Sequence, residues 1–155
     1  MISNVKGSIM GLAGEVTENV SDPSLSSVEA TLDVSTLNTG EGQRDTHVKS
    51  GDFLDVEKYP TITFKSTKVQ RKSNEEYEVS GELTLHGVTR PVTLEVEGPS
   101  PQHKDPWGNT RIGLSATTKI NRKDFGLTYN AALETGGVLI GEEVHVTIDV
   151  ELIKQ

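Results

Sequence analysis

The sequence predicts one all-β antiparallel domain that spans residues 1–155. Two observations indicate this class: apolar and polar residues alternate along most of the chain, and short turn signals separate the alternating stretches. Alternation puts one face of each strand in a core and the other in water. Without helices large enough to cover the apolar faces, about seven or eight strands must bury them against one another, in a barrel or a sandwich. The strands are long, which favours a barrel.

Seven stretches carry the alternation. The first, residues 9–17, is the weakest because glycines interrupt it. The others have apolar residues at alternate positions over 28–34, 62–69, 77–85, 92–96, 112–120 and 144–152. These stretches are the expected strands.

Turn residues mark the ends of several strands, at Ser73-Asn74, His86-Gly87, Gly98-Pro99 and Gly136-Gly137. Residues 83–94 therefore form an expected hairpin, in which Pro91 is suited to a strand start or an edge because it lacks an N–H. Only two segments favour helix. One is 42–55, where Asp45 or Thr46 could cap a short turn, and the other is a single turn over 121–126 that a glycine ends.

Composition excludes several classes of function. With 23 acidic and 15 basic residues, the net charge of −8 has the wrong sign for nucleic acid or an anionic membrane surface. The absence of cysteine excludes disulfides, thiolate zinc sites and a cysteine nucleophile. No apolar stretch reaches the length of a membrane span, and the N-terminus lacks the pattern of a signal peptide. We therefore expect a cytoplasmic protein, or a periplasmic or extracellular one if an upstream signal peptide was removed.

Three segments resemble those of a known family: QRDTHVKSGDFLDVEKYPTITF at 43–64, GELTLHGVT at 81–89 and INRKDFGL at 120–127. They are similar to the hallmarks of the YceI-like family, which is described as polyisoprenoid-binding with a lipocalin-like fold. The resemblance covers essentially the whole chain. It implies a lipocalin-like, eight-stranded antiparallel β-barrel with an apolar tunnel for an isoprenoid or fatty amphiphile.

The sequence departs from the family pattern at its start. Family members usually begin with a further apolar strand, and this sequence opens at the segment that follows that strand. If the strand is missing, the barrel has an open seam and an unpaired edge that a second chain could fill, which would make a homodimer.

Two sets of residues are candidates for the lipid site. The tunnel wall is expected to include inward-facing apolar residues, although the same residues could simply fill a core: Val28, Leu32, Phe64, Val79, Leu83, Leu94, Leu114, Val146 and Ile148. A rim for a polar head group would use basic residues of the motifs, namely Arg44, His47 and Arg122. Alternatively, Arg44 pairs with a nearby aspartate and holds the long loop.

Residue patterns typical of catalysis are missing from the sequence. Its serines lack the Gly-x-Ser-x-Gly elbow, no glycine-rich loop for a phosphate links a strand to a helix, and the four histidines are too scattered for a metal site. We therefore expect a non-catalytic carrier without cofactor or metal. An isoprenoid-modifying enzyme and a self-associating module with a collapsed core remain the alternatives.

Overall fold

The computed structural model describes residues 5–130 and 140–155, and the predicted turn at Gly136-Gly137 lies outside them. Within these ranges one sheet contains eight strands. The strands are β1 (Ala13–Thr17), β2 (Ser27–Asp33), β3 (Thr61–Arg71), β4 (Glu76–Leu85), β5 (Val88–Glu97), β6 (His103–Lys104), β7 (Thr110–Asn121) and β8 (Glu143–Ile153). The helical segments are η1 (Pro23–Leu25), η2 (Val34–Thr36), α1 (Gly42–Lys49) and η3 (Arg122–Phe125).

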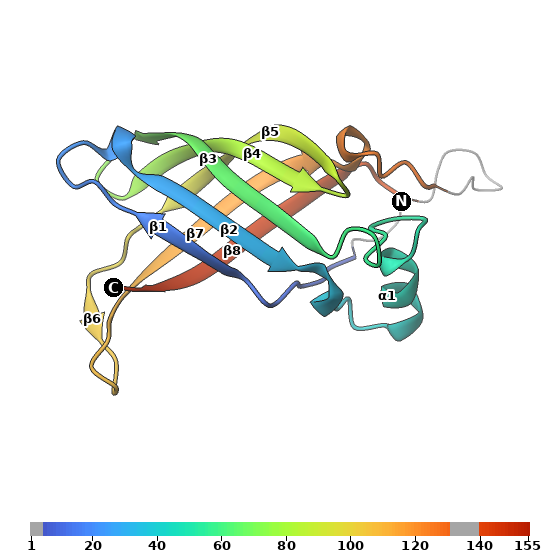
Figure 1. Cartoon of the computed structure of the whole chain (residues 1–155), viewed down its shortest axis with the longest axis horizontal. Helices are drawn as coiled ribbons and strands as arrows, with labels where there is room; N and C mark the ends of the chain where they lie inside the picture. The colour runs from blue at the N-terminus through green and yellow to red at the C-terminus, as the bar shows by residue number, and fades with distance from the viewer. Residues whose placement is uncertain (1–4, 131–139) are drawn as a thin grey trace.

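All strand pairs are antiparallel. Strands β1 to β5 pair in chain order, β5 pairs with β7, and β7 pairs with the short β6 and with β8. The sheet curls so that β7 and β8 lie behind β1 and β2 (Figure 1). No pairing joins β1 to β8 among the described residues, so hydrogen bonds do not close the sheet. The predicted antiparallel, lipocalin-like fold is confirmed as an open cup.

The inward side chains form two buried clusters. Phe64, Val69 and Val79 make one, and Leu85, Phe125 and Leu127 make the other. In the first, the Phe64 ring lies against the backbone of Gly81, where a Cβ atom would come within 2.5 Å of the ring. A glycine in this strand thus makes room for the largest side chain of the cluster.

The helical predictions were correct in place and wrong in detail. Helix α1 and the turn η3 lie in the two expected segments. The N-cap of α1 is Glu41, whose carboxylate accepts from the N–H groups of Gln43 and Arg44, so Asp45 and Thr46 lie inside the helix and do not cap it. Strand β2 ends at Asp33, and Val34 begins the unpredicted turn η2 because the Asp33 carboxylate caps that turn.

Candidate binding site

The interior of the cup has a packed side and an open side. On the packed side, Val28, Leu83 and Leu94 lie against the buried cluster of Phe64 and Val79. Strand register explains this grouping, because Phe64 is opposite Leu83 and Val79 is opposite Leu94. Five of the predicted wall residues therefore pack together on this side.

The open side is the wall formed by β7 and β8. Leu114, Val146 and Ile148 lie here and face inward. Their partners on the adjacent strand are Val150, Thr118 and Ala116, which face inward as well. Both strands fall within the described ranges, and none of their inward apolar residues is buried. Of the predicted wall residues, only Phe64 and Val79 are buried. Leu32, which lies opposite Ile62 on β3, is partly exposed, as are the three residues of this wall. This wall is an apolar surface that the rest of the protein covers only in part.

The predicted rim residues Arg44 and His47 use their polar atoms within the protein. The Nε atom of Arg44 donates to the Thr39 hydroxyl over 2.8 Å, and an Nη atom donates to the Thr39 carbonyl over 2.9 Å. The hydroxyl and the N–H of Thr39 both donate to the Asp45 carboxylate, and these two bonds lower the pKa of Asp45. His47 lies 2.9 Å from an Asp52 oxygen. These contacts hold the loop around α1.

Arg122 is the third predicted rim residue, and its side chain is buried, with 5% of the residue exposed. Its guanidinium donates to the carbonyls of Leu127, Gly141 and Ile140 over 2.6, 2.8 and 3.3 Å. Because these bonds join η3 to the segment before β8, the evident role of Arg122 is to position the loops at this end of the barrel.

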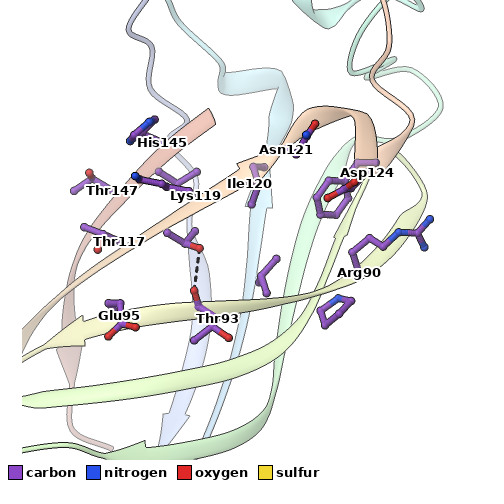
Figure 2. Close-up of a pocket in the computed structure, with 15 residues that line it drawn as sticks. Arg90, Thr93, Glu95, Thr117, Lys119, Ile120, Asn121, Asp124, His145 and Thr147 are labelled. Atoms are coloured by element: carbon purple, nitrogen blue, oxygen red, sulfur yellow. Dashed lines mark hydrogen bonds between the residues drawn. The ribbon is translucent and has the colours of Figure 1, made fainter. Parts of the chain in front are cut away.

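A cleft between β5 and β7 was missed by sequence reasoning. These strands pair over only three residues each, with Val96 opposite Ala116 at the centre. Where they separate, the Thr118 hydroxyl donates to the Thr93 carbonyl over 2.9 Å, as Figure 2 shows. A cleft of about 660 Å³ opens beyond this bond. The one sequence signal was Pro91, which lacks an N–H.

The cleft has mixed chemistry. Arg90 and Glu95 line it from β5, Lys119 lines it from β7, and Asp124 lines it from η3 (Figure 2). Four threonines add hydroxyl groups: Thr93, Thr117, Thr118 and Thr147. Its apolar lining comes from Val92, Ile120, Phe125 and Val146, together with Pro91. This combination suits a ligand with a polar and an apolar part.

Two further classes of feature do not occur in the described ranges. No group of three or more histidine and acidic side chains in them could hold a metal ion. They also contain no helix with the length and apolar character needed to cross a membrane.

Comparisons with known sequences point to one family. A family model described as a YceI-like domain matches residues 1–152. Protein YceI of Salmonella paratyphi B is 38% identical over 149 residues, which are 96% of this chain and 74% of that protein. A UPF0312 protein of Vibrio cholerae serotype O1 is 41% identical over 125 residues, or 81% of this chain. The chain spans 66% of that relative's length, slightly less than two thirds.

Solved structures show the same fold. The Campylobacter jejuni YceI protein superposes with a TM-score of 0.83 and 28% sequence identity, over 100% of this chain and 88% of that one. BcnA of Burkholderia cenocepacia superposes with a TM-score of 0.80 over 98% of this chain and 90% of that one. At 21% identity, BcnA is evidence for the fold alone.

Proposed function

Because the chain belongs to the YceI-like domain family, we propose that it carries an isoprenoid or a similar amphiphilic lipid inside its cup and performs no chemistry on it. Family membership suggests the class of ligand. The observation that carries the proposal is the wall of β7 and β8, whose inward apolar residues are not buried. A lipid chain lying on this wall would cover it.

Burial of apolar surface supplies enough free energy for such binding. Each methylene moved from water into an apolar site contributes about 0.8 kcal/mol. A lipid tail along Leu114, Val146 and Ile148 would gain this energy without hydrogen bonds to the protein. Tight binding therefore does not need the predicted basic rim.

The test fills the space beside the wall. Ala116 faces inward on β7 opposite Ile148 on β8, so Ala116→Phe should occupy the volume of the lipid tail. We expect the affinity for geranylgeraniol, a C20 prenol, to fall about tenfold, measured by native mass spectrometry and a fluorescence competition assay. The thermal stability of the ligand-free protein should stay the same or rise.

The control is Ser115→Phe, which places the same ring on the outer face of β7, where the Ser115 hydroxyl donates to Asp149. It should leave the affinity unchanged. In a filled core, the added ring at Ala116 would instead cost about 1–3 kcal/mol of stability. That loss, or a wild-type chain that binds no prenol, would contradict the proposal.

Self-association through the seam is a second candidate function. Within the described residues, β1 and β8 each pair on one side only. Val16 on β1 and Val144 on β8 face inward beside these free edges and are 38% and 40% exposed. A strand from a second copy would cover both residues and satisfy the free backbone groups.

A further inference from the structure

The cleft between β5 and β7 exists because backbone pairing stops early. The Thr93 carbonyl points toward β7, where it accepts the Thr118 hydroxyl. Residues two apart in a strand direct their backbone groups to the same side, so Pro91 presents its nitrogen to β7 as well. Since proline has no N–H, the strands cannot continue their ladder at this position. On its other side, Pro91 still pairs with Glu82 of β4.

The cleft reaches both faces of the barrel wall. Its lining includes His145 and Thr147, which face outward on β8, and Val146, which lies between them and faces inward. Two other inward residues line it, Val92 of β5 and Ile120 of β7, and both pack against the buried cluster around Phe125. The cleft is therefore lined by residues of both faces of the wall and borders the apolar cluster around Phe125.

The charge of the cleft is balanced although the whole chain carries −8. Arg90 and Lys119 contribute two positive charges, and Glu95 and Asp124 contribute two negative ones. His145 lies 2.6 Å from a Glu143 carboxylate oxygen. A phosphate group would meet the two carboxylates as well as the two cations and gain little net attraction, whereas an uncharged hydroxyl or carbonyl can bond with the threonines.

We infer that this cleft is a side portal, through which the tail of an amphiphile passes between β5 and β7 while its uncharged polar head stays among the threonine hydroxyls. The inference rests on the proposed lipid-carrying function and adds an entry route and a class of head group. The amphiphile that fits is a long-chain alcohol, phenol or ketone.

The first experiment labels the wild-type chain. A geranylgeraniol analogue with a diazirine beside its hydroxyl is bound and irradiated, and the labelled peptides are identified by mass spectrometry. We expect the label on residues 90–93, 117–121 or 145–147, which line the cleft. Label confined to the loop around α1, to β1 or to residues 148–153 of β8 would overturn the inference.

The second experiment blocks the portal. Because the chain has no cysteine, Thr93→Cys provides a single thiol for a bulky maleimide. The adduct should slow the association of geranylgeraniol about tenfold, measured by stopped-flow fluorescence. The matched control is the adduct of Thr31→Cys, since Thr31 is also an exposed, outward-facing threonine, on β2. It should associate as fast as the wild type.

The outcomes separate the inference from the function on which it rests. Equal association rates for both adducts would overturn the portal alone. A wild-type chain that binds neither geranylgeraniol nor geranylgeranyl diphosphate would overturn the lipid-carrying function and the portal with it. For the head group, the alcohol should bind at least as tightly as the diphosphate, and a diphosphate that binds about tenfold more tightly would overturn the uncharged head.

Discussion

Asp105 stabilises the turn between β6 and β7 through a nearly buried carboxylate, whose side chain is 6% exposed. It accepts hydrogen bonds from the backbone N–H groups of Trp107 and Asn109 and from Nε of Arg111 over 2.9, 2.9 and 2.7 Å. Burial alone would raise the pKa of Asp105, but the bonds from Arg111, Asn109 and Trp107 hold it well below its ordinary value of 3.8. The ionised carboxylate therefore stabilises the folded state.

This depressed pKa predicts how stability depends on pH. Because the folded-state pKa lies below 3.8, the contribution is present in full above that value and is lost as the pH falls toward the folded-state pKa. Asp105→Asn should lower the melting temperature at pH 7, and the difference from the wild type should shrink below pH 3.8. Thermal unfolding followed by circular dichroism between pH 2.5 and pH 7 measures both.

The control for this residue is Asp149→Asn, since Asp149 accepts an exposed hydrogen bond from the Ser115 hydroxyl. It should change the melting temperature much less. A difference between Asp105→Asn and the wild type that stays constant over the whole pH range would show that the carboxylate does not stabilise the turn by its charge.

At the scale of single elements, η3 shows how a short turn organises one end of the barrel. The Asn121 side chain caps its start, and Gly126 ends it at a φ of 75°, which glycine adopts without strain. Phe125 enters the buried cluster with Leu85 and Leu127, while Arg122 bonds to Leu127 and to the segment before β8. The turn thus fixes the loops beside the cleft.

Loss of the Arg122 guanidinium should loosen this end of the molecule. Arg122→Met keeps an apolar stem but removes the three hydrogen bonds that the guanidinium donates, while the Ile140 carbonyl keeps its bond from Asn130. We expect the free energy of unfolding to fall by about 3 kcal/mol. Urea unfolding measures the loss. The matched control is Lys123→Met, which removes only an exposed ion pair with Glu142 and should have a far smaller effect. Equal effects of the two variants would contradict the positioning role of Arg122.

At the scale of the whole molecule, the main feature is that hydrogen bonds do not close the sheet. Open edges favour pairing with another chain, whereas an open apolar wall favours a lipid. The two proposals therefore predict different oligomeric states and different lipid contents in solution. A carrier is a monomer with a retained lipid, and a self-associating module is a dimer without one.

Native mass spectrometry and light scattering of the purified chain distinguish the monomer with lipid from the dimer without lipid. If copies pair through the seam, Val16→Lys should convert a dimer into a monomer, because it places a charge on the inward face of the edge strand β1. Thr31→Lys, on the outer face of β2, should leave the dimer intact. A wild-type chain that is monomeric at all concentrations would exclude the seam as an interface.

The sequence predicted the strands well because alternation is a local property. Each expected strand exists, the hairpin around His86-Gly87 forms, and α1 and η3 lie where polar, non-alternating residues predicted them. The motifs also identified the family, which the comparisons confirm. The candidate site was less predictable. Which face of a strand points inward follows from parity, but whether that face is covered depends on strands far away in the sequence.

What the sequence by itself determined is therefore the set of strands, their inward faces and the family. Only the tertiary structure decided that β1 and β8 do not pair, that β5 and β7 separate beyond Thr93, and that Arg44 and Arg122 bond within the protein. The physical reason is the distance along the sequence over which each kind of interaction acts. Alternation and capping act between residues a few positions apart, whereas sheet closure and donor partners arise from contacts that the chain makes only once it has folded.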